Sequence, residues 1–225
     1  MIEFYHQVDY ANPFPGLRSF DYEDSNLFFG RDQPISELKD ILHMARLLAI
    51  VGNSGSGKSS LIKAGLIPTL QRERKDWSVI ALTLGRDPFQ SLTVALQQYF
   101  TDQKTDVSNL DIDHLLRQNA DSLTNLLSAQ EEQTILLFID QFEEIFRHSL
   151  DDSDQPTEQE TIADFIKLLL TASQKPDNHI FIVLTMRSDF LDYCTLYEGL
   201  TEAINKGSYL LPKMNASEIR EVIVR

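Results

Sequence analysis

The sequence is poor in cysteine and in long hydrophobic runs. Its single cysteine, Cys194, excludes an internal disulfide and favours a reducing compartment. No stretch approaches the roughly 20 consecutive apolar residues of a membrane-spanning helix. The first residues, Met-Ile-Glu-Phe-Tyr-His, lack the basic and apolar regions of a signal peptide. We therefore expect a cytoplasmic protein that makes no contact with a membrane.

Basic residues are also scarce, with 20 Lys and Arg against 34 Asp and Glu and a formal net charge of −14. This balance disfavours nonspecific attraction to nucleic acid or to anionic lipid. We expect no direct nucleic-acid partner, and a polyanionic ligand has to be bound by a small group of local residues. The length of 225 residues suits one α/β domain with a sizeable core and a further fragment.

One segment has the residues for such local phosphate binding. Residues 52–59 read Gly-Asn-Ser-Gly-Ser-Gly-Lys-Ser, which fits the pattern G-x-x-x-x-G-K-[ST] and follows the apolar run 47–51. The glycines let backbone N–H groups turn toward a polyphosphate, Lys58 reaches its β and γ oxygens, and the Ser59 hydroxyl binds Mg²⁺. A helix beginning here would direct its positive end at the phosphates. The nucleotide-binding residues predicted for this loop are Gly52, Asn53, Ser54, Gly55, Ser56, Gly57, Lys58, Ser59 and Ser60.

Apolar runs alternate with amphipathic segments along the chain, which is typical of a parallel sheet with helices on both faces. The central runs are rich in Val, Ile, Leu and Phe and show little alternation, as strands covered on both faces do. We therefore predict a three-layer α/β fold with a five-stranded parallel sheet. Its expected strands are Leu47–Val51, Ser78–Leu84, Thr134–Ile139, Ile180–Thr185 and Ser208–Leu211.

Two helix starts are marked by capping residues. Asp87 is a predicted N-cap, followed by Pro88 at the first helical position. Residues 157–160, Thr-Glu-Gln-Glu, read as the capping box of a second helix. Between residues 111 and 130 we expect two short leucine-rich helices.

A phosphate-binding loop needs a metal-binding carboxylate at the end of a neighbouring strand. The third predicted strand leads into Asp140, which we expect to hold Mg²⁺ together with Ser59. Glu143 and Glu144 follow within one turn, and either can polarise the attacking water as a general base. Spacing alone does not identify which, although we favour Glu144. Both can also be read as solvent-facing acids at the start of a helix.

The fourth predicted strand leads to Arg187, so that a guanidinium leaves the sheet at the same carboxyl edge as Asp140. Ligands of open α/β sheets bind at that edge. Arg187 can contact a γ-phosphate through two hydrogen bonds and so contribute to catalysis. A surface ion pair with Asp189 is the alternative. Arg86 and Arg147 also follow strand ends and are weaker candidates.

Aromatic and turn residues are concentrated before the first strand, at residues 12–20 and 27–32. They can wall an adenine pocket, or the phenylalanines can belong to the core while the prolines shape a lid over the sheet edge. We predict Phe29, Gly30 and Arg31 as further nucleotide-binding residues.

The end of the sequence carries a capped helix. Residues 215–218, Asn-Ala-Ser-Glu, precede an apolar stripe at Ile219, Val222 and Ile223. A helix of about ten residues with one apolar face is marginal alone, so we expect the natural protein to continue into another helical domain; a terminal helix folded back on the sheet is the alternative. The predicted organisation is an N-terminal segment that contributes to the nucleotide pocket at 1–46, a nucleotide-binding core at 47–212, and the start of a helical domain at 213–225.

Taken together, these segments resemble the STAND class of signal-transduction ATPases, in particular the bacterial novel STAND NTPases. The phosphate-binding loop alone indicates only the P-loop NTPase superfamily, and the Asp-Gln-Phe-Glu-Glu core and the Thr-Met-Arg strand end narrow it to this class. The resemblance spans nearly the whole chain. It is carried by residues 12–20, 29–31, 52–70, 138–146, 185–187 and 211–212.

The resemblance implies a P-loop NTPase core in AAA+-like strand order, with the Arg187 strand between the strands that lead to Gly52 and to Asp140. It also implies that Leu211-Pro212 and the helix after it are the entry to a winged-helix segment. The sequence departs from the family pattern at Leu84, where a proline is expected. This departure leaves the role of Arg86 open.

For function, the resemblance implies ATP rather than GTP as the ligand, with ADP holding a closed monomer and ATP permitting self-association of the full-length protein. The leading hypothesis is therefore an ATP-binding and slowly ATP-hydrolysing switch, with ATP/ADP and Mg²⁺ as cofactors, that controls oligomerisation of a larger defence or signalling protein. A nucleotide-binding assembly module without significant turnover is the alternative. A GTPase is disfavoured because Asn205-Lys206-Gly207-Ser208 lacks the aspartate that would pair with guanine.

Overall fold

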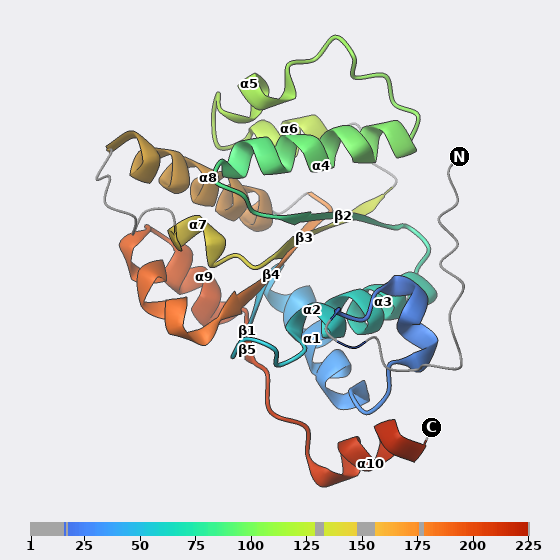
Figure 1. The fold of residues 1–225 in the computed structure, drawn as a ribbon. Coiled ribbons are helices and arrows are strands. Elements are labelled where there is room, and N and C mark those ends of the chain that lie inside the picture. The colour runs from blue at the N-terminus through green and yellow to red at the C-terminus, as the bar shows by residue number, and fades with distance from the viewer. Residues whose placement is uncertain (1–15, 17, 129–132, 148–155, 176–177, 225) are drawn as a thin grey trace.

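Five parallel strands form one sheet in the order β2-β3-β4-β1-β5 (Figure 1). The computed structural model describes residues 16, 18–128, 133–147, 156–175 and 178–224. The predicted parallel sheet is confirmed, and the strand bounds differ from the expected ones by one or two residues at most. The strands are β1 (Leu47–Gly52), β2 (Trp77–Thr83), β3 (Thr134–Asp140), β4 (Ile180–Arg187) and β5 (Ser208–Leu210).

The order of the strands brings three sequence motifs to one edge of the sheet. β4 pairs with β1 so that Arg187 lies opposite Gly52, and it pairs with β3 so that Leu184 lies opposite Ile139. The strand of Arg187 therefore lies between the strands of the phosphate-binding loop and of Asp140, as AAA+-like order implies. Because all three strands are parallel, their carboxyl ends meet at the same edge.

Both faces of the sheet are covered, which explains why its strands lack polar alternation. In β1, Leu47, Ala49 and Val51 belong to one hydrophobic cluster, whereas Leu48 and Ile50 belong to another. Successive side chains of a strand point to opposite faces, so the two clusters are the cores on the two sides of the sheet. This three-layer arrangement confirms the predicted fold class.

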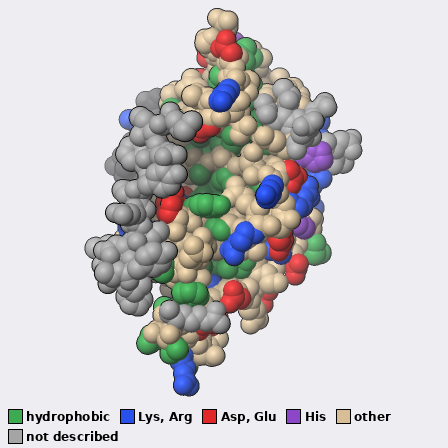
Figure 2. Space-filling view, turned by 90° about the vertical axis from the view of Figure 1, so that its right-hand side faces the viewer, with side chains coloured by type: hydrophobic (Ala, Val, Ile, Leu, Met, Phe, Trp, Pro, Cys, Tyr) green, Lys and Arg blue, Asp and Glu red, His purple; other side chains and the backbone are tan. Residues whose placement is uncertain are grey.

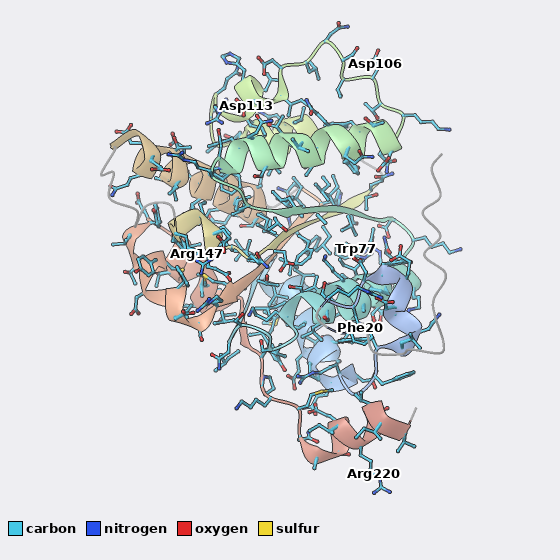
Figure 3. All side chains as sticks on the ribbon, viewed as in Figure 1. Phe20, Trp77, Asp106, Asp113, Arg147 and Arg220 are labelled. Atoms are coloured by element: carbon cyan, nitrogen blue, oxygen red, sulfur yellow. The ribbon has the colours of Figure 1, made fainter. Side chains whose placement is uncertain are left out.

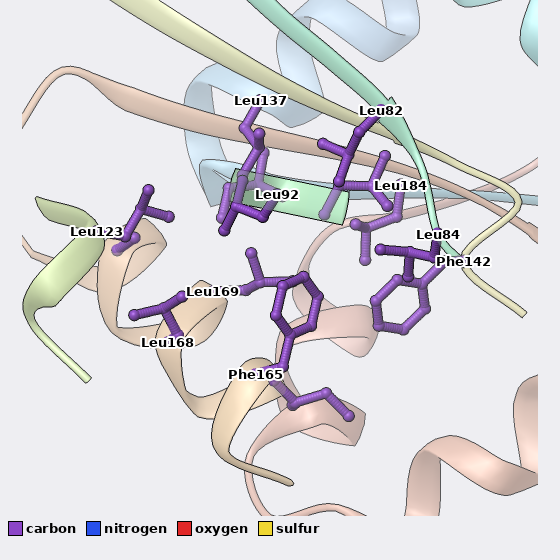
Figure 4. Close-up of a cluster of buried hydrophobic side chains, with 14 of the residues drawn as sticks. Leu82, Leu84, Leu92, Leu123, Leu137, Phe142, Phe165, Leu168, Leu169 and Leu184 are labelled. Carbon is purple, nitrogen blue, oxygen red and sulfur yellow. The ribbon is translucent and has the colours of Figure 1, made fainter. Parts of the chain in front are cut away.

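One face is covered by helices that pack on the larger cluster. Figure 4 shows Leu137 and Leu184 of the sheet facing Phe165 and Leu169 of α8. The two short helices expected between residues 111 and 130 are present as α5 and α6. The helices of this face are α4 (Pro88–Asp102), α5 (Ile112–Leu116), α6 (Ser122–Leu127), α8 (Pro156–Gln174) and α9 (Leu200–Lys206).

The other face is covered by α1 (Asp32–Ala45) and by the helix that follows the phosphate-binding loop. That helix consists of α2 (Lys58–Ser60), a π-helical segment η2 (Leu61–Leu66) and α3 (Ile67–Glu73). The π-helical segment ends at Leu66, two residues before Pro68, which lacks an N–H group and crowds the preceding turn of an α-helix. The wider turn accommodates the proline without ending the helix.

The two predicted helix starts have different outcomes. Asp87 caps α4, because its Oδ1 accepts hydrogen bonds from the N–H groups of Phe89 at 3.0 Å and Gln90 at 3.3 Å. The predicted start of α8 is wrong, since the helix begins at Pro156 and Thr157 therefore lies in its first turn. Proline suits the first helical position because its φ is already helical and its missing N–H would have no partner there.

The remaining elements connect the layers or follow them. They are η1 (Tyr22–Leu27), α7 (Glu144–Arg147), η4 (Ser188–Leu196) and α10 (Ala216–Val224). Within the described ranges, no helix is long and apolar enough to cross a membrane.

Helix α10 lies apart from the sheet (Figure 1). The predicted cap at residues 215–218 is confirmed and is a capping box: Asn215 Oδ1 accepts from the N–H groups of Ser217 and Glu218, and Glu218 Oε2 accepts from the N–H of Asn215 at 2.6 Å. None of its residues is buried, and Figure 3 shows Arg220 pointing away from the molecule. The helix contacts the loop before α1, where a Cβ added to Gly30 would lie 2.6 Å from the Glu218 carbonyl oxygen.

Candidate nucleotide-binding site

A cavity of about 640 Å³ lies at the carboxyl edge of the sheet, within the 300–1,000 Å³ typical of small-molecule sites. It is formed by four segments that are far apart in the sequence. The lining residues are Ser54–Ser60 of the phosphate-binding loop, Asp140, Gln141 and Glu143 after β3, Thr185 and Arg187 of β4, and Gly16, Arg18, Ser19 and Phe20 of the N-terminal segment.

The phosphate-binding loop has a conformation that needs its glycines. Gly55 and Gly57 have φ angles of 72° and 89°, in the left-handed region that side chains disfavour. The loop is closed by a hydrogen bond from the Ser56 N–H to the Asn53 carbonyl at 3.2 Å. After Gly57 the chain enters α2, so the N–H groups at this helix start lie at the cavity. Such groups bind anions well because they have no partner within the helix.

Lys58 is folded over its own loop. Its side chain donates hydrogen bonds from Nζ to the carbonyl oxygens of Gly52 and Asn53, each at 2.9 Å, and only 9% of the residue is exposed. Burial lowers the pKa of the Lys58 ammonium, while the carboxylates of Glu143 and Asp140 oppose that shift. The ammonium is therefore held in the cavity, where phosphate oxygens can replace its two carbonyl partners.

Three oxygen atoms converge beside the loop. The hydroxyl groups of Ser59 and Thr185 both donate to Asp140 Oδ1, at 2.7 Å and 2.5 Å. Among the described residues, no group of three or more His, Cys, Asp or Glu side chains could hold a metal ion. A hydroxyl and one carboxylate fit Mg²⁺, because this ion takes few protein oxygens and completes its shell with phosphates and water. Ser59 and Asp140 are thus brought together as the sequence predicts.

The structure distinguishes the two glutamates. Glu143 lines the cavity, is 5% exposed and accepts a hydrogen bond at Oε2 from the backbone N–H of Arg187 at 3.3 Å. Glu144 pairs with Arg147 at 3.0 Å and does not line the cavity. Burial raises the pKa of the Glu143 carboxyl above its usual value, against the smaller effects of its backbone hydrogen bonds and of Lys58. The geometry therefore favours Glu143, in contrast to our preference for Glu144.

A turn at Gln141 explains why Glu143, and not Glu144, lines the cavity. Its φ is 57°, an uncommon value for a residue with a side chain, and its N–H donates to Thr185 Oγ1 at 3.0 Å. The turn directs Phe142 into the hydrophobic core and leaves Glu143 in the cavity. Strained backbone of this kind is found disproportionately at functional sites.

Arg187 lies at the cavity and forms the ion pair with Asp189 that the sequence offered as an alternative. It lines the cavity, and it also forms two hydrogen bonds with Asp189, from Nε to Oδ1 at 3.0 Å and from Nη2 to Oδ2 at 2.6 Å. Ser188 adds a link to the loop, because its hydroxyl donates to Asn53 Oδ1 at 3.2 Å. Asp189 holds the guanidinium in place beside the cavity.

The other predicted residues lie elsewhere. Phe29, Gly30 and Arg31 do not line this cavity; Arg31 donates from Nη1 to the Pro212 carbonyl at 3.2 Å, and Gly30 contacts α10. Arg86 is 80% exposed in its side chain and lies 4.0 Å from Glu158. The role of Phe29, Gly30 and Arg31 in nucleotide binding stays a prediction. Residues 12–15 and 17 of the aromatic-rich segment are outside the described residues.

Sequence reasoning missed several residues of the cavity. Thr185 was identified only as part of a motif, although a hydroxyl beside Asp140 could be inferred from a polar residue at the end of the next strand. Gln141 carried no signal, since its role depends on a backbone angle. The sequence indicates Arg18 and Phe20 only as members of the aromatic-rich segment. The fold brings Phe20 to Ser60 and Arg18 to the lining of the cavity.

The fold and this site are those of a P-loop NTPase. Residues 13–225 match the family Novel STAND NTPase 1. The chain belongs to this family, which confirms the resemblance seen in the sequence. A comparison with curated proteins gave no match.

Solved structures share the fold. The Walker-type ATPase PABY2304 of Pyrococcus abyssi has a TM-score of 0.52 and 19% identity, over 90% of this chain and 58% of that one. A chain of the E. coli MS115-1 HORMA:CdnC:Trip13 complex has a TM-score of 0.56 and 12% identity, over 89% of this chain and 69% of that one. The present chain thus spans little more than half of the Pyrococcus ATPase.

Proposed function

We propose that this chain is the core of a cytoplasmic molecular switch that binds MgATP and hydrolyses it slowly, and that the nucleotide controls self-association of a larger signalling or defence protein. The observation that carries the proposal is the convergence of Lys58, Asp140, Glu143 and Arg187 on one cavity beside the phosphate-binding loop. Family membership supports it. ATP rather than GTP follows from the missing guanine-reading aspartate and from the family.

Binding depends on the loop and the start of α2. The N–H groups of Gly55 and of residues 57–60 surround the phosphates, and Lys58 exchanges its bonds to the Gly52 and Asn53 carbonyls for bonds to phosphate oxygens. Ser59 and Asp140 hold Mg²⁺, which neutralises charge that develops on the phosphates. Because the site supplies positive charge locally, it can bind a polyanion in spite of the acidic character of the whole chain.

Hydrolysis depends on Glu143 and Arg187. A carboxylate with a raised pKa is a better proton acceptor than an ordinary one, so Glu143 can orient the attacking water and take its proton. Arg187 contacts the γ-phosphate while Asp189 keeps its guanidinium in place. The end of β4 thus contacts the one phosphate in which ATP and ADP differ.

The test compares Glu143→Gln with Glu144→Gln in steady-state phosphate release, together with ATP affinity. We expect Glu143→Gln to lower turnover by roughly 10²–10⁴-fold with ATP binding retained. Glu144→Gln is the matched control and is expected to keep turnover within about twofold, because Glu144 pairs with Arg147 outside the cavity.

The outcomes of this test decide which glutamate is the general base and whether the chain is an ATPase at all. If turnover falls only in Glu144→Gln, the assignment of the base to Glu143 is wrong. If neither variant lowers phosphate release while ATP still binds, the chain is the alternative, an assembly module in which ATP is a structural ligand.

A further inference from the structure

The N-terminal segment lies directly against the phosphate-binding loop. The backbone N–H of Phe20 donates to Ser60 Oγ at 3.1 Å, and the Phe20 ring packs edge-on against Phe28 with 5.6 Å between the centroids. Figure 3 shows Phe20 on the side of the sheet that carries α2 and α3. The segment is therefore fixed to the first turn after the loop, and Arg18, Ser19 and Phe20 line the cavity there.

A buried carboxylate positions the guanidinium of Arg18. Its Nη1 and Nη2 groups donate to Oδ2 and Oδ1 of Asp24, the second bond at 3.0 Å, and Nη1 also donates to the Ser19 carbonyl at 3.1 Å. Asp24 is 7% exposed and is itself fixed by the N–H of Asp21 at 2.8 Å. Arg18 Nε–H and the second Nη2–H take no part in these bonds, so the guanidinium keeps donors for a ligand in the cavity.

Arg18 and Lys58 are held by different segments of the cavity lining. Lys58 Nζ donates to the carbonyl oxygens of Gly52 and Asn53, whereas the Arg18 guanidinium donates to Asp24 and to the Ser19 carbonyl. Lys58 marks the place of the terminal phosphates, because it reaches the β and γ oxygens of a nucleotide in this loop. The α-phosphate and the nucleoside then extend toward Ser60, where Phe20 and Arg18 lie.

We propose that Arg18 is a nucleotide-binding residue that contacts the part shared by ATP and ADP, at the α-phosphate and nucleoside end of the cavity. The proposal rests on the ATP site proposed above and adds a cation on the side of the cavity formed by the N-terminal segment. It assigns the two arginines different tasks: Arg187 responds to the γ-phosphate, whereas Arg18 binds both nucleotides equally. Asp24 acts as a positioning residue for Arg18.

Calorimetric titration of ATP and ADP into Arg18→Ala and Arg187→Ala tests this division. Loss of a charge-assisted contact is expected to weaken binding by roughly ten- to hundredfold. In Arg18→Ala both nucleotides should lose affinity by the same factor, whereas in Arg187→Ala the loss should be larger for ATP than for ADP. Arg74→Ala is the matched control, because Arg74 also pairs with an aspartate, Asp76, but does not line the cavity.

Two results overturn the proposal. One is wild-type affinity of Arg18→Ala for both nucleotides; the other is a loss confined to ATP, which would place Arg18 at the γ-phosphate. If wild-type protein binds neither nucleotide, the ATP site itself is wrong, and this outcome is distinct from the first two. Thermal melting checks the fold, and Arg18→Gln provides the same comparison if the alanine variant does not fold.

Discussion

Glu143 is an ionisable carboxylate in an almost fully buried position. Burial raises its pKa above the usual value of a glutamate, and hydrogen bonds from its own backbone and from the Arg187 N–H oppose this effect only in part. Keeping this side chain ionised at neutral pH therefore reduces the free energy of unfolding. Such a cost is common at sites where function needs a destabilised group.

We predict that Glu143→Gln stabilises the protein at neutral pH by about 1 kcal/mol. Because the folded-state pKa of Glu143 is raised, the folded protein takes up this proton more readily than the unfolded chain. The wild-type residue is thus least favourable above its folded-state pKa, and the difference from Gln should disappear as the pH falls below the usual glutamate value. Chemical denaturation of both proteins across this range measures the effect.

The matched control at this scale is Glu144→Gln. Its carboxylate forms a partly exposed ion pair with Arg147, and pairs of this kind contribute little to stability. If Glu143→Gln is no more stable than wild type at neutral pH, burial of the ionised Glu143 carboxylate does not destabilise the protein, and the account is contradicted.

At the scale of elements, the junction between α9 and β5 depends on one glycine. Gly207 ends α9, and its carbonyl accepts the Ala49 N–H at 2.7 Å. A Cβ at this position would lie 1.9 Å from the Leu47 carbonyl oxygen and 2.8 Å from Ala45 Cβ. Because the backbone at Gly207 lies so close to the backbone of β1, β5 can pair with β1.

We predict that Gly207→Ala lowers the free energy of unfolding by about 2–4 kcal/mol, because backbone rather than a flexible side chain has to move. Gly85→Ala is the control, since its Cβ would lie 3.5 Å from Ser91 Oγ in ordinary contact. Urea denaturation of both variants measures the difference. Equal stability of the two variants would refute the close packing at this junction.

Strands were more predictable than helix ends or site details. The strands β1, β3 and β4 are buried on both faces, so a continuous apolar run marks each of them. The start of α8 was misplaced because two N-terminal signals, Pro156 and the capping box at 157–160, overlap in the sequence. Local pattern alone does not choose between them.

Site residues that belong to a sequence motif were predictable. Residues whose side-chain direction depends on a backbone angle were not. Lys58, Ser59 and Asp140 follow from the loop pattern and from the strand that leads to Asp140. The choice of Glu143 over Glu144 required the positive φ of Gln141, which no residue type signals. The place of Arg18 at the cavity depends on a long-range hydrogen bond from the Phe20 N–H to Ser60 Oγ.

At the scale of the whole molecule, an acidic chain forms a cavity that contains several cations. The chain has a net charge of −14, and Figure 2 shows Lys, Arg, Asp and Glu side chains interspersed on the face in view rather than gathered by sign. The lining of the cavity instead contains three cations, Arg18, Lys58 and Arg187, against the carboxylates of Asp140 and Glu143. The fold thus brings three cations from distant segments together at the carboxyl edge of the sheet.

The central claim, a MgATP site at this edge, is tested most directly by titrating MgATP into wild-type protein and Lys58→Ala in a calorimeter. Lys206→Ala is the control, since Lys206 lies at the end of α9, just before the first residue of β5, and therefore at the opposite edge of the sheet. We predict binding to wild type and to Lys206→Ala, and a loss of at least tenfold in affinity for Lys58→Ala. Wild-type affinity in Lys58→Ala would contradict the account.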